Sequence, residues 1–466
     1  MRRLFAVATL VALTLGLLAT PAQAQPAPRS FLILANGSSL PPGLEGRITA
    51  AGGAVSNRIP EVGIVVATGD DAFAARARRI AGVRSVVPNF RFQRIQPRMA
   101  EGVTLDYGNP PNSGDDDTLF DLQWGHDAID APEAWNAGYF GAGARVAVLD
   151  EGFDLDHPDL AENIVGSKSF VPGEEASAGY LLPDAFSHGT HVAGTIAAAD
   201  NGLGVIGVAP KAELVLVKVL SEILGYGEFD WVIQGIVYAA GEADADVINM
   251  SLGGTLPRNG GCDTEGCFTA AETAELLVAI SRATTYAHRQ GTTIIASAGN
   301  DANDGDKDKA LVHMPSDATH VISISATAPI GWATDPANTF LDNLASYSNF
   351  GQSAIDFAAP GGDFVYPGEE PCTIAGLTRP CWVFDFVFST GSNPTPGLAS
   401  YYWSVGTSMA APHAAGVAAL IIGKNGGSMH PAQVEAAMRR GADDLGKPGN
   451  DAAYGAGRVN AYQSVR

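Results

Sequence analysis

The strongest constraint on the fold is a series of apolar, β-branched segments that alternate with helical patterns between residues 122 and 458. The clearest strands are expected at Arg145–Leu149, Glu213–Val219, Val247–Met250, Thr292–Ser297 and Val321–Ala326. Helical patterns lie between them, including His188–Ala199, Phe229–Ala240 and Ala270–Gln290. Strands that are apolar throughout are typical of a parallel sheet covered on both faces. The sequence therefore predicts an α/β fold, a doubly wound and mostly parallel sheet with helices on both faces.

A smaller unit precedes this region. Strand patterns at Phe31–Leu34, Gly63–Ala67 and Val83–Phe92 alternate with helical patterns at Pro42–Ala51 and Asp70–Ala81. This order predicts a small α+β, ferredoxin-like unit. The pattern then weakens, and the turn- and acid-rich residues 108–117 are expected to form an exposed linker. We place the domain boundary near residue 100.

The first residues have the pattern of a secretion signal. Arg2 and Arg3 precede an apolar run, Leu4–Leu18, and Ala22–Ala24 forms a small-x-small cleavage site. Residues 1–24 are therefore predicted to be a signal peptide. A transmembrane anchor is the alternative, but the run is too short for a comfortable span. No later stretch is long and apolar enough to cross a bilayer. We expect a secreted, extracellular or periplasmic protein without stable membrane insertion.

Charge is unevenly distributed along the chain, whose net charge is −22. Residues 1–98 contain 12 Lys/Arg and 4 Asp/Glu, whereas the remainder contains 16 Lys/Arg and 46 Asp/Glu. An acidic body argues against nucleic acid as a partner. The opposite signs predict instead that the leading segment and the body attract each other.

Four cysteines form two local pairs in Gly- and Pro-rich surroundings. Cys262 lies close to Cys267, and Cys372 lies close to Cys381. In an exported protein these spacings predict two loop-closing disulfides. A single four-cysteine metal site is the alternative, although neither spacing is a tight C-x-x-C.

Four polar residues stand at positions where the predicted fold collects functional side chains. Asp150 directly follows an apolar strand, and Asn300 follows another. His188 begins a helical pattern that Ser187 can cap, and Ser408 begins a helix within Gly406–His413 that continues in small and aliphatic residues. Alone, each has an ordinary structural interpretation as a cap or turn. Together, and in the order Asp, His, Ser, they indicate nucleophilic catalysis.

These segments resemble the subtilisin family of serine proteases. The similar segments span roughly residues 122–460 in the family's order: Val146–Gly152, His157–Leu160, His188–Gly194, Val247–Gly254, Ser297–Asn300, Ala345–Asn349, Gly406–His413 and Tyr454–Asn460. The resemblance implies a secreted, self-processing serine endopeptidase that acts on peptide or protein substrates. It also implies an inhibitory, folding-assisting pro-segment over residues 25–100 and a catalytic domain over residues 101–466. We expect autoprocessing within Arg94–Glu101 and a monomeric product.

The resemblance also assigns roles within the site. Ser408 is expected to be the nucleophile, His188 the general base and then general acid, and Asp150 the residue that orients the imidazole. Asn300 and the Ser408 backbone N–H are expected to form the oxyanion hole. His157, His191 and His413 are expected to be structural.

Two segments are expected to receive the substrate. Ser251, Leu252, Gly253 and Gly254 offer backbone groups for β-type pairing. Leu252–Gly254 and Ser297, Ala298 and Gly299 are expected to wall the first specificity pocket. Because these residues are small and largely uncharged, the sequence favours medium to large apolar substrate side chains.

The resemblance extends to a structural calcium site, and no catalytic cofactor is expected. Asp159 and Asn201 match ligand positions, and oxygen ligands suit Ca²⁺, although an ordinary polar turn explains the same residues. A second acidic cluster, Asp301, Asp304, Asp306 and Asp308, is expected to be a solvated loop rather than a calcium site.

One residue departs from the family pattern beside the predicted triad. Glu151 stands where a small hydroxyl residue is usual. Its carboxylate either raises the pKa of the neighbouring imidazolium or faces solvent. The rival functions are a catalytically silent subtilase-fold binding protein, which the intact site residues disfavour, and an esterase that uses the same triad.

Overall fold

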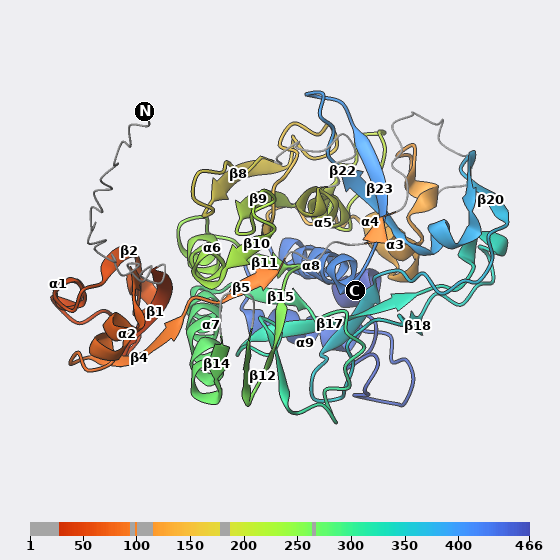
Figure 1. The fold of residues 1–466 in the computed structure, drawn as a ribbon. Coiled ribbons are helices and arrows are strands. Elements are labelled where there is room, and N and C mark those ends of the chain that lie inside the picture. Colours follow the sequence, from red (N-terminus) through yellow and green to blue (C-terminus); the bar gives the residue numbers. More distant parts are fainter. Residues whose placement is uncertain (1–27, 94–97, 100–114, 178–186, 263–266) are drawn as a thin grey trace, which may run out of the picture.

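The structure of the chain is a computed structural model, which describes residues 28–93, 98–99, 115–177, 187–262 and 267–466 (Figure 1). The predicted signal peptide lies outside these residues. So do Arg94–Pro97 and residues 100–114, which hold most of the predicted processing segment and of the predicted linker. None of the helices in the described part of the chain is both long and apolar enough to span a membrane.

An eight-stranded, mostly parallel sheet forms the centre of the larger domain. Its strand order is β18-β17-β15-β11-β7-β9-β8, and β19 pairs with β17. The strands are β7 (Arg145–Asp150), β8 (Ile164–Ser169), β9 (Glu213–Lys218), β11 (Val247–Met250), β15 (Thr293–Ser297), β17 (Val321–Ala328), β18 (Asn343–Leu344) and β19 (Phe357–Pro360). Only the β17–β18 pair is antiparallel. The predicted fold class and all five predicted strands are confirmed.

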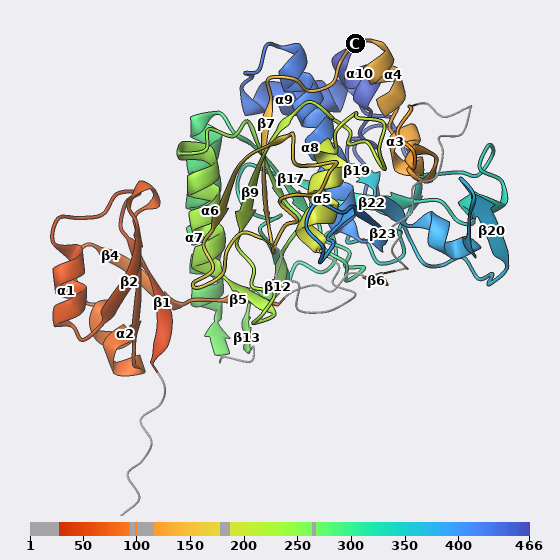
Figure 2. The ribbon, with the colours of Figure 1, turned by 90° about the horizontal axis from the view of Figure 1, so that it is seen from above.

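Helices cover both faces of the sheet, as Figure 2 shows. Helices α5 (His188–Ala197) and α8 (Thr407–Lys424) lie on one face, and α6 (Phe229–Gly241) and α7 (Ala270–Gln290) lie on the other. Successive residues of β7 supply the two cores: Val146 and Val148 pack on the α8 side, and Ala147 and Leu149 pack on the α6 side. A strand that is apolar on both faces is buried on both, which is why its sequence shows no polar alternation.

The long helix α7 shows how local sequence fixes an element. Thr269 and Glu272 form a capping box at its start, in which each side chain accepts a hydrogen bond from the other residue's backbone N–H. Gly291 ends the helix in the left-handed region, at φ 105°. The predicted range Ala270–Gln290 is confirmed at both ends.

The remaining elements complete the larger domain. They are α3 (Trp124–Ala128), α4 (Ala131–Asn136), β10 (Tyr226–Glu228), β12 (Gly254–Pro257), β13 (Gly260–Cys262), β14 (Cys267–Thr269), β16 (Leu311–Met314), β20 (Pro371–Ile374), β21 (Leu377–Pro380), β22 (Val387–Gly391), β23 (Ser400–Val405), α9 (Pro431–Gly441) and α10 (Ala461–Val465), with short 3-10 turns at Phe120–Leu122, Trp332–Thr334 and Cys381–Asp385.

The leading unit is a separate small domain with its own sheet and core. Its elements are β1 (Arg29–Ala35), α1 (Leu44–Ala50), β2 (Ala54–Ile59), β3 (Ile64–Gly69), α2 (Asp71–Ala77) and β4 (Val83–Pro88). The antiparallel strand order β2-β3-β1-β4 and this element order are those of a ferredoxin-like fold. The sequence analysis missed β2, because this edge strand alternates exposed and half-buried residues and carries polar side chains.

The small domain docks along α7 and against the start of α6. Arg78 pairs with Glu272 at 2.9 Å, and Arg84 donates two hydrogen bonds to Glu275, at 2.9 and 3.0 Å. In the opposite direction, the larger domain's Arg282 donates to the backbone carbonyls of Ala35, Gly37 and Val62. The predicted attraction therefore acts through a few specific pairs.

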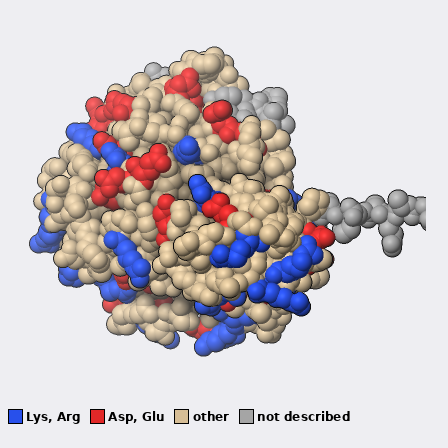
Figure 3. All heavy atoms as spheres, turned by 90° about the vertical axis from the view of Figure 1, so that its left-hand side faces the viewer, with Lys and Arg blue, Asp and Glu red and all other residues tan. Residues whose placement is uncertain are grey.

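Figure 3 looks onto this side of the molecule and shows basic and acidic groups on the same face. Most acidic groups lie in its upper half, and most basic groups lie in its middle and lower parts. Arg78 and Arg84 remain 48% and 44% exposed within their ion pairs. Salt will therefore screen part of their attraction for the larger domain.

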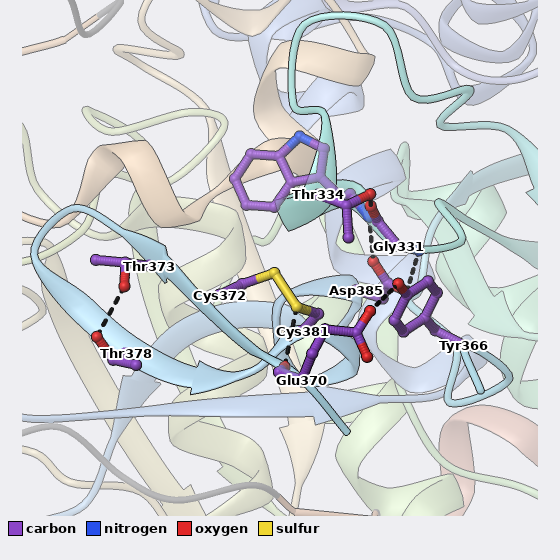
Figure 4. The surroundings of a disulfide bond; sticks show 10 residues. Gly331, Thr334, Tyr366, Glu370, Cys372, Thr373, Thr378, Cys381 and Asp385 are labelled. Carbon is purple, nitrogen blue, oxygen red and sulfur yellow. Dashed lines mark hydrogen bonds between the residues drawn. A yellow bond between two sulfur atoms is a disulfide. The ribbon is translucent and has the colours of Figure 1, made fainter. Parts of the chain in front are cut away.

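Both predicted disulfides are present, so the alternative of a four-cysteine metal site is wrong. Cys262 is bonded to Cys267 between β13 and β14, and Cys372 is bonded to Cys381 at the base of the β20–β21 hairpin. Figure 4 shows the second bridge, with a Thr373–Thr378 hydrogen bond across the hairpin. Beside it, Asp385 accepts hydrogen bonds from the backbone N–H groups of Gly331 and Trp332, at 2.7 Å each. The bridge ties the hairpin to a buried part of the domain.

Candidate active site

The predicted carboxylate and imidazole meet at the carboxyl end of the sheet. Asp150 is the last residue of β7, and His188 is the first residue of α5. Asp150 Oδ1 lies 2.8 Å from His188 Nδ1. Asp150 is completely buried, and His188 is 5% exposed. A buried carboxylate on Nδ1 fixes the ring orientation and leaves Nε2 for proton transfer.

Glu151 holds the start of the helix that carries the imidazole. Its Oε1 accepts a hydrogen bond from the backbone N–H of His188 at 2.9 Å, and the residue is only 1% exposed. Ser187 caps the same helix, as predicted, by accepting from the Thr190 N–H at 3.1 Å. The alternative in which Glu151 faces solvent is therefore wrong. An anion at a helix N-terminus is favourable, because the first N–H groups have no partner within the helix.

Ser408 lies in the first turn of α8, which packs against α5. Its hydroxyl is 3.3 Å from the carbonyl oxygen of Ser251. Pro412, four residues further on, has no N–H to donate to the Ser408 carbonyl. The hydroxyl of Ser251 donates to that carbonyl instead, at 2.7 Å. Ser251, which was expected to bind substrate, therefore also holds the backbone of Ser408.

Asn300 lies beside the same helix turn, and Thr407 orients its amide. Asn300 Oδ1 accepts from the Thr407 N–H at 2.9 Å and from the Thr407 hydroxyl at 2.8 Å. With the oxygen held in this way, the NH₂ group is left to donate elsewhere. Thr407 was missed by the sequence analysis, because its role depends on a contact with a residue 107 positions away.

The segments expected to form the first specificity pocket line one cavity of about 600 Å³. Gly253, Gly254, Ser297, Ala298 and Gly299 all contribute to its wall. Leu252 does not, because it is packed into the core at 2% exposure. Two side chains from outside the predicted segments, Asp301 and His313, also line the cavity and add polar and charged groups to its wall.

Gly299 sits at a position where only glycine fits. Its φ is +105°, and a Cβ there would lie 2.4 Å from Asn349 Nδ2. A side chain would thus displace Asn349, which donates to the Ala298 carbonyl at 2.8 Å. The conformation of this wall of the cavity depends on that glycine.

The chain that leaves the small domain is paired on both sides of the site. Strand β5 (Arg91–Gln93) pairs with β10, and Phe90, Arg91 and Gln93 line the cavity described above. Strand β6 (Arg98–Met99) pairs with β23, with Arg98 opposite Val405. Val405 is three residues before Ser408. Strands β5 and β6 are therefore each held beside a segment of the site.

The three other histidines of the predicted motifs are buried and lie within hydrogen-bonding distance of main-chain carbonyl oxygens. His157 Nε2, His191 Nε2 and His413 Nδ1 lie 2.8–3.2 Å from main-chain carbonyl oxygens. Burial lowers the pKa of His157 and of His413 to about 4 each. Burial, together with the charge of His188, lowers the pKa of His191 to about 3. These rings are neutral and structural near neutral pH.

The residues expected to bind calcium lie next to a group of carboxylates that the sequence analysis had placed in an exposed linker. Asp159 is buried; its Oδ2 accepts from the Val205 N–H at 3.2 Å, whereas its Oδ1 has no hydrogen-bond partner among the described residues. Asp117 is also buried; its Oδ1 lies 3.4 Å from the Asn201 backbone nitrogen, and its Oδ2 has no hydrogen-bond partner in the part of the chain that the structure describes. Burial, with a hydrogen bond and charge from Asp115, raises the pKa of Asp117 to about 9.

Carboxylate oxygens of four residues here lie within 4.8 Å of one another: Asp115, Asp116, Asp117 and Asp200. Unpaired, buried carboxyl oxygens are costly unless they are protonated or bound to a cation. An all-oxygen donor set of this kind fits a hard divalent cation such as Ca²⁺. The side-chain oxygen of Asn201 is used locally, because it accepts from the Leu203 N–H at 2.9 Å.

The second acidic cluster has other partners. Asp304 pairs with Lys307 at 2.6 Å. Asp306 accepts from the N–H groups of Gln352 and Ser353, at 2.8 and 3.1 Å. These carboxylates hold the loop against a neighbouring turn, in agreement with the expectation that the cluster is a loop.

Comparisons with known proteins show the family to which this chain is similar. The sequence profile of the subtilase family matches residues 141–457. Subtilisin Savinase from Lederbergia lenta is 35% identical over 347 residues, which cover 74% of this chain and 99% of that protein. Thermitase from Thermoactinomyces vulgaris is 32% identical over 345 residues, which cover 74% of this chain and 96% of that protein.

A solved structure extends the similarity to the small domain. Fervidolysin from Fervidobacterium pennivorans, described as a keratinolytic enzyme related to subtilisin, superimposes with a TM-score of 0.68 at 25% identity. The superposition covers 96% of this chain and 62% of that one. With the family profile spanning most of the larger domain, the conclusion is direct: this chain belongs to the subtilase family and is a subtilisin-like serine endopeptidase.

Proposed function

We propose that the chain hydrolyses peptide bonds through Asp150, His188 and Ser408 and that it is made as a secreted, self-processing precursor. The observation that carries this proposal is the 2.8 Å contact between Asp150 Oδ1 and His188 Nδ1, on a helix that packs against the helix bearing Ser408. A buried carboxylate–imidazole pair beside a serine hydroxyl is the minimum needed for acyl transfer.

In this mechanism His188 Nε2 removes the proton from Ser408 Oγ as the oxygen attacks the substrate carbonyl carbon. Asp150 stabilises the imidazolium that forms. The Asn300 NH₂ group and the Ser408 N–H donate to the carbonyl oxygen, which carries the developing negative charge. His188 then protonates the leaving amine, and an acyl-enzyme remains. Water, deprotonated by His188, attacks that ester and releases the acid, which restores Ser408.

Self-processing is supported by the positions of strands β5 and β6. Strands β5 and β6 are held on opposite sides of the site, so the bond to be cut lies between Gln93 and Arg98. We assign residues 1–24 to a signal peptide, and we move the boundary between the inhibitory pro-segment and the catalytic domain, first placed at residue 100, to this bond. The docked small domain would block the substrate groove until it is released, because β5 lies against the cavity wall.

A structural calcium ion is the second part of the proposal. The residues that would hold it are Asp159 and the four clustered carboxylates Asp115, Asp116, Asp117 and Asp200. Its binding would offset the repulsion among these carboxylates and would fix the turn around Asn201 against the start of the larger domain. No step of the reaction uses it.

Mass spectrometry of purified protein beside the Ser408→Ala variant tests the proposal. Wild-type protein is expected to have a mature N-terminus between residues 94 and 98, whereas Ser408→Ala retains the small domain. The control Ser464→Ala, which removes a hydroxyl far along the chain from the site, should process normally. Processing that continues in Ser408→Ala would overturn the assignment of the nucleophile.

Two rival functions give different results in the same preparation. A catalytically silent binding protein would fail to react with a fluorophosphonate probe at Ser408. An esterase would react with the probe but would turn over ester substrates without cleaving the matched peptides. The proposal requires probe labelling together with peptide cleavage.

A further inference from the structure

The cavity beside the site carries a polar chain of three side chains on the catalytic domain. Thr255 lies on β12 and His313 on the neighbouring β16, and these antiparallel strands place the two residues directly opposite each other. Asp301 follows Asn300 in the chain. All three line the cavity. The rest of the catalytic-domain wall consists mainly of glycine, aliphatic and aromatic residues and backbone.

Thr255 contacts both the carboxylate and the imidazole of this chain. Thr255 Oγ1 donates to Asp301 Oδ2 at 3.1 Å and lies 2.8 Å from His313 Nδ1. A hydroxyl has only one hydrogen. With that hydrogen on the carboxylate, the 2.8 Å contact is a hydrogen bond in the tautomer of His313 that carries its proton on Nδ1. Asn349 Nδ2 is also near this nitrogen, but at 3.4 Å, and it donates to the Ala298 carbonyl at 2.8 Å.

This arrangement leaves hydrogen-bond acceptors facing the cavity. A singly protonated ring that donates through Nδ1 has its lone pair at Nε2, and the Asp301 carboxylate keeps its second oxygen. Among the described lining residues, Asp301 and Arg91 are the only ones with a permanent charge. Arg91 belongs to the small domain and pairs with Glu228 at 3.2 Å. Removal of the small domain leaves the described wall of the cavity with a net negative charge.

We propose that Asp301, Thr255 and His313 make this pocket select substrates whose P1 side chain, on the acyl side of the cleaved bond, ends in a hydrogen-bond donor. Lysine and arginine are the preferred residues, because their cationic ends complement the carboxylate and the Nε2 lone pair. Apolar side chains of the same length leave these acceptors without partners. This inference rests on the proposed function, in which the cavity next to Asn300 receives the P1 side chain.

The test is a set of peptide anilides that differ only at P1 in matched pairs: lysine and norleucine, glutamine and glutamate, tyrosine and phenylalanine. In each pair the first member carries a terminal donor that the second lacks. The full-length protein, purified after its own processing, is expected to show kcat/KM at least about tenfold higher for lysine than for norleucine. Glutamine should exceed glutamate.

Three variants link the preference to the pocket. Asp301→Asn and Thr255→Val are expected to lower the lysine-to-norleucine ratio about tenfold, towards one. Asp335→Asn removes an equal charge outside the cavity wall and should leave the ratio at its wild-type value. A wild-type ratio of one or less, or an equal ratio in Asp301→Asn and Asp335→Asn, would overturn the inference. Failure of the proposed function looks different, because no peptide of the set would be cleaved and Ser408 would not be labelled.

Discussion

The Glu151 carboxylate accepts a hydrogen bond from the backbone N–H of His188 at 2.9 Å. Glu151 therefore holds the main chain of His188, whereas the preceding residue, Asp150, orients the imidazole ring. Both acidic side chains are buried, at 1% and 0% exposure. Two consecutive residues at the end of β7 thus hold both the ring and the main chain of one histidine.

Glu151→Ala is therefore expected to lower kcat about tenfold with little change in KM, because the helix start can shift while the substrate groove stays intact. Glu151→Gln keeps an oxygen that can accept the same hydrogen bond, so it should recover most of the lost rate. The measurement is steady-state kinetics of both variants on one peptide substrate. Equal losses in Ala and Gln would show that the charge, and not the bond to His188, matters.

Thr407 is expected to position the oxyanion donor. Its hydroxyl donates to Asn300 Oδ1 and accepts from the Gly299 N–H at 3.2 Å. Thr407→Val removes both bonds without a large change in volume and should reduce kcat about tenfold, whereas Asn300→Leu should cost about 10²–10³. In the double variant the two losses should not add, because both act through the same amide. Additive losses would contradict a positioning role.

The strands and helices that were predicted correctly carry local sequence patterns that identify them. The strand Val146–Leu149 and its parallel neighbours are apolar on both faces, and α7 carries its own capping box. The missed strands β2 and β8 lie at sheet edges, where exposed and half-buried residues alternate. Edge strands carry less of the apolar pattern that makes central strands visible in a sequence.

Site residues could be predicted where they stand at the start or end of a strand or helix that the sequence itself indicates. Asp150 and His188 end and begin elements that the sequence already indicates. The Thr255–His313 contact, in contrast, joins residues 58 positions apart across a short outer ladder. Asp117 was assigned to an exposed linker from its composition, but folding buries it completely. Contacts of this kind depend on tertiary packing, which no local pattern encodes.

Arg84 makes the best-formed ion pair between the two domains, because it donates two hydrogen bonds to Glu275 and Ser85 adds a third at 2.8 Å. Burial tends to raise the pKa of Glu275, but these hydrogen bonds and the charge of Arg84 outweigh it and lower the pKa. Arg84→Ala should weaken retention of the small domain after processing about fivefold, since partly exposed pairs contribute roughly 1 kcal/mol or less.

The measurement is the fraction of full peptidase activity in freshly processed protein at low and high salt. At low salt, the Arg84→Ala variant should show a higher fraction of full activity than the wild type, and added salt should raise that fraction less. The matched control is Arg58→Ala, whose partner Glu45 lies within the small domain. If Arg58→Ala released activity to the same extent, the effect would come from small-domain stability and not from the contact.

Removal of divalent cations is expected to destabilise the larger domain through the carboxylates around Asp117. At calcium concentrations a hundred times the dissociation constant, binding would contribute about 2.7 kcal/mol, so a chelator should lower the thermal midpoint by several degrees. In the Asp117→Asn variant, the difference between the thermal midpoint in calcium and the thermal midpoint in chelator should be smaller than in the wild type. Asp306→Asn, in the second acidic cluster, should keep the full difference. The reverse pattern would place the ion in the second cluster.

Buried histidines predict a loss of stability in mild acid. Burial lowers the pKa of His413 to about 4, whereas the unfolded chain has the ordinary value near 6.5. Because the folded pKa is the lower one, the unfolded state binds more protons as the pH falls from 6.5 towards 4. The stability that the neutral ring contributes is therefore present above pH 6.5 and is lost through this window. For His413 alone the loss between pH 7 and pH 5 is about 2 kcal/mol.

Carboxyl groups with raised pKa values act in the opposite direction in the same range. Burial raises the pKa of Asp154 and of Asp385 to about 7 each, so these groups favour the folded state as the pH falls. The histidine contribution must therefore be isolated by a variant. His413→Asn keeps a donor near the Nδ1 position, which lies 2.8 Å from the Met409 carbonyl oxygen, but it cannot take up a proton in this range.

In the inactive Ser408→Ala background, which prevents autolysis, urea unfolding at pH 7 and pH 5 should show a smaller drop in unfolding free energy for His413→Asn than for its parent. The expected difference between the two drops is about 2 kcal/mol, equal to the contribution of the single ring. Equal drops would mean that His413 is protonated in the folded state at pH 5, which its complete burial argues against.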